Sequence, residues 1–89
     1  MDANTRFRAN QQQLTEYMET MLGAFDGDKF LERFPTLLSE MHGMTTGAAI
    51  DHLIGEHTFT AHEAKPLVVA LHAMHIVDFA NNPPSFWGK

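Results

Sequence analysis

The sequence of 89 residues holds six histidines, as many as its lysines and arginines together, and no cysteine. Three polar residues near its C-terminal end, His72, His75 and Asp78, recur at every third position, so on a helix each lies about 60° from the next. Two imidazoles at this spacing can share one metal ion, and a nearby carboxylate can ligate the ion or orient a ligand. The spacing indicates a candidate site for Zn²⁺ or a similar ion.

Two other interpretations of the histidines stay open. Since no H-E-x-x-H or cysteine pattern accompanies them, His72 and His75 can form a narrow polar stripe on an otherwise buried helix. The histidines can also respond to pH, because protonating all six changes the formal charge from −5 to +1. In that case solubility or partner binding changes between about pH 7 and pH 5.5. His57, His62 and Glu63 are further possible metal donors.

The residue types that carry covalent catalysis are scarce. Without cysteine there is no thiolate, and the two serines, Ser39 and Ser85, lie outside any Gly-x-Ser-x-Gly turn. The glycines match neither the dinucleotide-binding nor the P-loop spacing. A chain of this length can hardly enclose both a substrate and a site from which water is excluded. We therefore do not expect an enzyme.

The charge distribution restricts the partners. The net charge is −5, and only Arg6 and Arg8 lie close together as basic residues, so the sequence lacks the basic patch that nucleic-acid binding needs. The longest mostly apolar stretch, residues 66–80, is too short and too polar to cross a membrane, and residues 1–13 lack the apolar core of a signal peptide. These features favour a soluble, cytoplasmic protein that binds neither nucleic acid nor membrane.

The elements that must position these residues are all helical. The sequence predicts an all-α single domain over residues 1–89, a small bundle of about four helices of unequal length. The first is expected over residues 5–22, capped by Asp2 or Asn4 and ended by Gly23. Gln11 interrupts its apolar face, either as an edge position or as a polar residue that fixes the register of a helix–helix interface. The apolar positions follow the helical period: Phe7, Leu14, Met18, Met21 and Phe25.

The second and third helices are bounded by glycines. Asp28 can cap a helix that ends at Gly43, and Pro35 predicts a kink or split near Phe34. A short helix over residues 46–54, with Ala49, Ile50, Leu53 and Ile54 facing inward, is expected to end at Gly55.

The last helix is expected to be central in the bundle, because residues 67–80 are apolar on nearly every side. Thr60 and Glu63 predict a capping box at its start. Pro66 implies either that the first turn is a separate piece or that the helix proper begins near Pro66. Residues 81–84 stop it, and residues 81–89 form a short tail with two aromatic residues.

Four short helices with this many apolar faces must hide more surface than one small layer covers, so we expect a protein partner, a homodimer, or both. The leading hypothesis is a non-enzymatic, acidic helical binding module, an adaptor or inhibitor. In size, acidity and lack of catalytic motifs the chain resembles small accessory or phage-type inhibitors. The alternatives are a histidine-based metal-binding or pH-responsive protein and a structural subunit of a larger assembly. The expected partner contacts are Phe7, Gln11, Leu14, Met18, Phe86 and Trp87.

Overall fold

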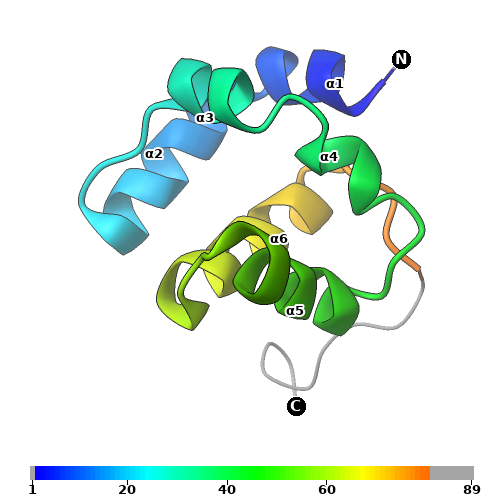
Figure 1. Ribbon diagram of the computed structural model, residues 1–89. Helices are drawn as coiled ribbons and strands as arrows, with labels where there is room; N and C mark the ends of the chain where they lie inside the picture. Colours follow the sequence, from blue (N-terminus) through cyan, green and yellow to red (C-terminus); the bar gives the residue numbers. More distant parts are fainter. Residues whose placement is uncertain (1, 81–89) are drawn as a thin grey trace.

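The structure, a computed structural model, describes residues 2–80, and these residues fold into helices without a strand (Figure 1). The all-α prediction is confirmed, but six helices replace the four expected, because two of the predicted helices are each divided. None of the helices in this part of the chain is long and apolar enough to cross a membrane. The helices are α1 (Ala3–Ala9), α2 (Gln11–Leu22), α3 (Gly27–Arg33), α4 (Leu37–Glu40), α5 (Thr46–His57) and α6 (Ala61–Ala73).

The predicted helix over residues 5–22 is two helices that meet at Asn10. The Asn10 backbone leaves helical geometry at φ −110° and ψ 12°, and its side-chain amide donates to the carbonyl oxygen of Arg6 at 2.9 Å. This hydrogen bond satisfies a carbonyl at the end of α1, which stabilises the break. The two ends were predicted correctly, since Asp2 caps α1 and Gly23 ends α2 with a left-handed φ of 90°.

Pro35 separates α3 from α4, as its position predicts. Phe34 ends α3 with φ −127° and ψ 64°, outside the α-helical region that a residue before proline avoids. The cap of α3 lies two residues before the predicted one. Asp26, not Asp28, accepts a hydrogen bond from the backbone N–H of Lys29 at 3.1 Å, so the helix begins at the glycine between the two aspartates.

Helix α5 begins at the cap of Thr45 and continues through Gly55, where the sequence predicted its end. The helix ends instead at Thr58, whose φ is 58°. The backbone N–H groups of Thr58 and Phe59 both donate to the carbonyl oxygen of Leu53, five and six residues earlier. Hydrogen bonds that span five or six residues, instead of four, make the last turn wider than an α-helical turn.

Helix α6 starts as predicted, with the reciprocal hydrogen bonds of a capping box between Thr60 and Glu63. Pro66 does not divide it, and one helix runs through this position. The proline removes the hydrogen bond to the carbonyl oxygen of His62, one turn earlier. Because His62 is exposed, water can satisfy that oxygen.

The predicted extension of this last helix to Ala80 is wrong. His75 takes a left-handed φ of 56°, and its backbone N–H donates to the carbonyl of His72 at 3.1 Å. The N–H of Ile76 donates to the carbonyl of Leu71 at 3.0 Å. This pair of hydrogen bonds is a Schellman motif, and Leu71 and Ile76, the positions whose apolar side chains commonly meet in this motif, are both fully buried.

After this turn the chain lies against the segment between α4 and α5. The N–H of Gly43 donates to the carbonyl of Asp78 at 2.8 Å, and the N–H of Ala80 donates to the carbonyl of Met44 at 2.7 Å. Residues 78–80 are therefore held by backbone hydrogen bonds to a neighbouring loop, not by a continued helix.

The core lies around α6, which packs against α5 and α2 (Figure 1). The side chains of Leu67, Val68 and Leu71 are at most 1% exposed. Among the described residues, the large hydrophobic side chains that are exposed are Met21 at 48% and Ile54 at 39%. Ile54 was expected to face inward and does not. The helical part of the chain thus hides most of its apolar side chains by itself.

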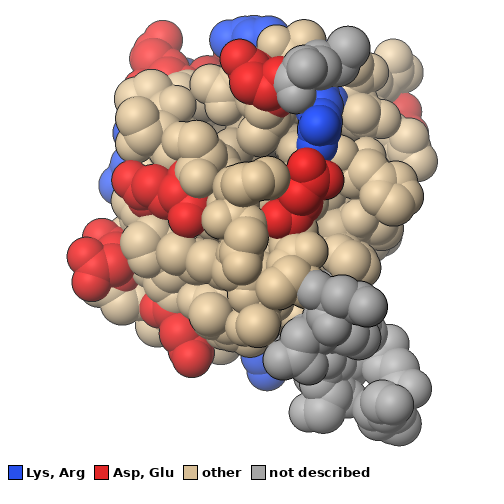
Figure 2. All heavy atoms as spheres, turned by 90° about the vertical axis from the view of Figure 1, so that its right-hand side faces the viewer, with Lys and Arg blue, Asp and Glu red and all other residues tan. Residues whose placement is uncertain are grey.

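Charged residues are dispersed on the face that carries α4 and the loop after it. Figure 2 shows acidic side chains standing apart among uncharged residues, and Lys and Arg form no cluster on the visible part of this face.

Candidate functional site

The structure does not bring His72, His75 and Asp78 together as the predicted metal site. The helix on which their spacing was measured ends at Ala73, so the turn after it changes the direction of His75 and Asp78. Within residues 2–80, these three side chains do not form a group whose donor atoms could share an ion. These side chains do not converge because the helix ends in a left-handed turn, which the spacing of every third residue does not reveal.

The two outer members of the predicted set have other neighbours. The carboxylate of Asp78 accepts a hydrogen bond from the guanidinium of Arg6 at 3.2 Å, and Nδ1 of His42 lies 4.0 Å from the same oxygen. The ring of His72 packs on Phe79 at a centroid distance of 5.9 Å.

Another set of metal-ligating residues does meet in space: Glu40, His52 and His57, which we call the His–Glu cluster. Oε1 of Glu40 lies 2.9 Å from Nε2 of His52 and 3.0 Å from Nε2 of His57. The two imidazole rings stand nearly perpendicular at a centroid distance of 5.1 Å. One carboxylate oxygen therefore holds both imidazoles.

The backbone explains how these residues meet. Glu40 is the last residue of α4, and both histidines lie on α5. In a regular α-helix, side chains five positions apart are about 140° apart around the axis. The wide last turn of α5 reduces this separation, so His52 and His57 reach the same carboxylate.

Neighbouring side chains fix the orientation of the cluster. The hydroxyl of Thr36 donates to the second oxygen of Glu40 at 3.2 Å. The ring of Phe34 meets the ring of His57 edge to face at 5.6 Å. The histidine side chains are about one fifth exposed, at 22% and 20%, and Glu40 is 38% exposed. The cluster is thus ordered on its protein side and reachable from solvent.

The cluster also changes the acidity of its carboxyl group. Hydrogen bonds from His52, then from His57, and a weaker one from Thr36 hold the pKa of Glu40 below its ordinary value of 4.5. These bonds favour the charged form of the carboxyl group. At neutral pH, Glu40 is an anion that accepts two hydrogen bonds from imidazoles.

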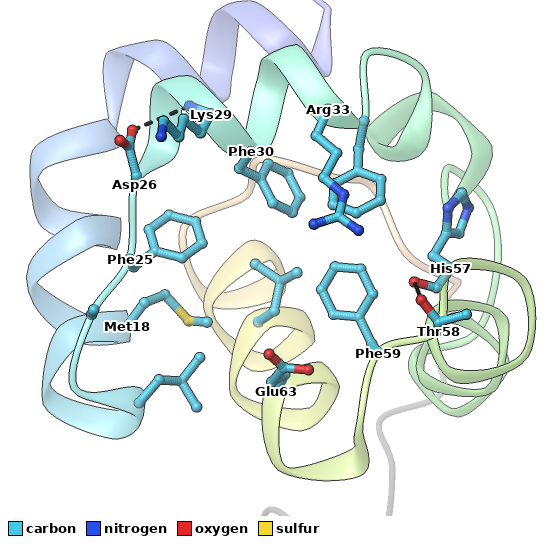
Figure 3. A pocket seen from close by; sticks show the side chains of 14 residues that line it. Met18, Phe25, Asp26, Lys29, Phe30, Arg33, His57, Thr58, Phe59 and Glu63 are labelled. Carbon is cyan, nitrogen blue, oxygen red and sulfur yellow. Dashed lines mark hydrogen bonds between the residues drawn. The ribbon is translucent and has the colours of Figure 1, made fainter.

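A groove of about 410 Å³ lies next to the cluster, between α3 and the segment that joins α5 to α6 (Figure 3). His57 belongs to both sites, since its ring touches Phe34 and its residue lines the groove. Apolar side chains from four parts of the chain form the floor and walls: Met18, Leu22, Phe25, Phe30, Phe34, Phe59 and Leu67.

The aromatic rings of the groove form a connected series. Phe30 contacts Phe25 at 5.8 Å and Phe34 at 5.5 Å, and Phe34 contacts Phe59 at 5.3 Å between ring centroids. Phe30 also stacks on the fully buried Phe7 at 5.4 Å, with 6° between the ring planes. Because the series is anchored in the core, the groove walls are preformed and not loose surface side chains.

The charged residues at the rim are of two kinds. Asp26 and Glu63 serve as helix-capping acceptors for Lys29 N–H and for Thr60. The side chains of Lys29 and Arg33 form no ion pair with the acidic residues that the structure describes. Figure 3 shows Arg33 reaching from α3 into the groove, where its guanidinium lies 5.3 Å from the ring centroid of Phe34. The groove is therefore lined by charges of both signs, and its two basic side chains have no carboxylate partner among the described residues.

Of the four expected partner contacts on the first helix, only Met18 lines the groove. Phe7 and Leu14 are fully buried, so they are core residues of the isolated chain. Met18 is 1% exposed and lies at the floor of the groove. Gln11 donates from its amide to Asp28 at 3.1 Å and packs so closely on Gly27 that a Cβ there would lie 2.9 Å from its Cγ. Gln11 therefore fixes how α2 and α3 approach each other.

The other two expected contacts, Phe86 and Trp87, belong to the aromatic tail at residues 81–89, which lies outside the described residues. Residue types and spacing in the sequence did not indicate Glu40, Arg33 or the groove. The signal that it contained was the number of phenylalanines, seven in 89 residues, more than half of them between Phe25 and Phe59.

Comparison with known proteins adds no relative. No family model matches the chain, and no curated protein and no solved structure shows significant similarity to it. The function is therefore argued from the His–Glu cluster and the groove themselves.

Proposed function

We propose that this chain is a non-enzymatic helical binding module, an adaptor or inhibitor that receives a segment of a partner protein in the groove between α3 and the α5–α6 junction. The observation that carries the proposal is the preformed aromatic wall of Phe30, Phe34 and Phe59 around an open space of about 410 Å³. Concave sites with mostly apolar walls and a few polar groups are typical of ligand-binding pockets.

The chemistry of the groove defines the segment that fits it. The apolar floor accepts one large aliphatic or aromatic side chain, the type of residue that anchors protein interfaces. The unpaired basic groups of Lys29 and Arg33 at the rim favour a carboxylate beside that anchor. The partner segment therefore carries a bulky apolar residue next to Asp or Glu. Its attraction to a chain of net charge −5 depends on these two basic side chains.

The experiment presents a library of short random peptides to the full-length chain. We expect the selected peptides to share a large apolar residue beside an acidic one. Two variants test the groove: Phe59→Ala removes part of the apolar wall, and Arg33→Glu replaces a basic side chain at the rim with an acidic one. Each is expected to weaken binding of the selected peptides by about 2 kcal/mol or more if these residues are central contacts.

The matched control is Ile54→Ala, which removes an exposed apolar side chain that does not line the groove. It should bind the same peptides as the wild type. Circular dichroism of each variant checks that the helices remain. Equal binding by the Phe59→Ala, Arg33→Glu and wild-type chains would contradict the proposal, as would a library that yields no binder.

A second copy of this chain is the other possible occupant of the groove. Light scattering of the wild type and of Phe59→Ala tests this alternative. A dimer that becomes a monomer only in the groove variant would assign the groove to self-association, whereas a wild-type monomer leaves it to a different protein.

A further inference from the structure

We propose that Glu40, His52 and His57 form a binding site for one divalent transition-metal ion of the Zn²⁺ type. This inference is independent of the proposed function, because it requires no occupant in the groove. It rests on one carboxylate oxygen and two imidazole nitrogens whose positions converge from α4 and α5.

The three donors match the ligand preference of the ion. Zn²⁺ is bound by imidazole nitrogens and carboxylate oxygens at about 2.0–2.2 Å, and tetrahedral geometry at that radius places ligand atoms about 3.3 Å apart. Oε1 of Glu40 lies 2.9 and 3.0 Å from the two Nε2 atoms, and one donor atom from each residue lies within 4.8 Å of the others. To admit an ion, the two Nε2 atoms must move away from Oε1 of Glu40 by a few tenths of an ångström. Side-chain rotations are sufficient for such a movement.

The hydrogen bonds of the cluster show how the ion would enter. An ionised carboxylate only accepts hydrogen bonds, so both Nε2 atoms carry a proton when they contact Glu40. Binding of the ion requires each imidazole to present an unprotonated Nε2 and to keep its proton on Nδ1. The ion then takes the place of the two Nε2 protons that His52 and His57 donate to Glu40.

The surroundings of the cluster are those of an open site. The hydroxyl of Thr36 holds the second carboxylate oxygen, and the ring of Phe34 supports His57, which are contacts that orient ligands from outside. All three ligand side chains keep part of their surface exposed, from 20% to 38%. Three protein ligands on a partly exposed surface leave a fourth position for water or an added donor.

The test is calorimetric titration of the untagged full-length chain with Zn²⁺ alone, with Co²⁺ absorption as a second readout of ligand geometry. We expect one ion per chain. Glu40→Gln, His52→Gln and His57→Gln should each lower the affinity by more than the roughly 10- to 100-fold that loss of an outer contact causes. Glutamine in place of histidine keeps an N–H donor for Glu40, so these variants remove a metal ligand without leaving the carboxylate unpaired.

The matched controls are His72→Gln and His75→Gln, which change the histidine pair that does not converge. They should keep wild-type affinity. In the wild type, NMR signals of the His52 and His57 rings should shift on addition of Zn²⁺, which supports the site even if a variant fails to fold. Loss of binding in the His72→Gln or His75→Gln chain alone would overturn the proposal. So would affinity that is the same in the wild type and in all three cluster variants, or ring signals that do not respond to the ion.

Discussion

Helices α5 and α6 each end at a residue other than glycine with a left-handed backbone, Thr58 with φ 58° and His75 with φ 56°. At the end of α5 the hydrogen bonds return to Leu53 from five and six residues ahead, and the wide turn keeps His57 beside His52. At the end of α6, Ile76 and Val77 also donate to Leu71 from five and six residues ahead, but the left-handed residue His75 donates to His72, only three residues back, whereas Thr58 donates five residues back. This Schellman motif closes a tighter turn and carries the chain away from the helix axis.

At these two ends the geometry of the last turn, and not the spacing of residues along the sequence, determines which histidines meet. Residues five apart on α5 reach one carboxylate because Glu40 of α4 lies against that helix. His72, His75 and Asp78, which were predicted to share one helix face, are separated by the turn at His75. Among residues 2–80, the His–Glu cluster lies at the first end, and no comparable group of metal-ligating side chains converges at the second.

The largest change in stability is expected from replacing Leu53 and Leu71, whose backbone carbonyl oxygens accept the hydrogen bonds at these two helix ends. Leu53→Ala and Leu71→Ala each remove a fully buried side chain, so each should lower the free energy of unfolding by about 2–5 kcal/mol. Chemical denaturation measures the loss. A change below about 1 kcal/mol at either position would show that this helix end is not part of the packed core.

The left-handed residues themselves should give an effect of opposite sign. Thr58→Gly is expected to raise the stability by about 1 kcal/mol, because a β-branched residue pays most for a positive φ. His75→Gly should gain about half as much, since histidine tolerates this conformation better. Thr20→Gly is the control, because Thr20 lies in the exposed part of α2 and glycine there should destabilise the helix.

Thermal unfolding of the three variants separates the possibilities. If Thr58→Gly and Thr20→Gly both lower the melting temperature, Thr58 does not have a left-handed backbone and the wide turn of α5 is incorrect.

The sequence predicted those features of the fold that depend on neighbouring residues. The cap at Thr60, the stop at Gly23 and the break at Pro35 depend on residues within one turn, so local chemistry predicted them. The left-handed ends at Thr58 and His75 carry no glycine, because packing around them stabilises a conformation that their residue types do not favour.

The site was harder to predict than the fold for a related reason. His52 and His57 were visible in the sequence, but their partner Glu40 comes from another helix, and only the tertiary fold brings its side chain to them. The groove depends on rings from three separate segments. Contacts of this kind are tertiary, whereas spacing along one helix describes only local neighbours.

A smaller effect is expected in the pH dependence of stability at the end of α5. The imidazole hydrogen bonds lower the pKa of Glu40 in the folded chain, so its stabilising contribution is complete above the ordinary value of 4.5 and is lost as the pH falls through the folded value. Between pH 5.5 and 3.5, the wild type should therefore lose more stability than Glu40→Gln. Denaturation at a series of pH values measures this. Identical slopes for the two chains would mean that the carboxylate is not held by the histidines.

The smallest effect is expected at the end of α6. Asp78→Asn removes an ion pair with Arg6 in which the side chains are 33% and 58% exposed. Exposed pairs of this kind contribute about 0–1 kcal/mol, so the change in unfolding free energy should lie within that range. A loss of several kcal/mol would show that this carboxylate has a structural role comparable to that of the His–Glu cluster.

The most direct test of the central claim is NMR of the histidine side chains in the wild type and in Glu40→Gln, without added metal. The account predicts that the ring signals of His52 and His57 both move in the variant, because they share one carboxylate, while those of His72 and His75 stay in place. If removing the charge of Glu40 leaves His52 and His57 unchanged, the two imidazoles do not meet at the end of α5, and the account is contradicted.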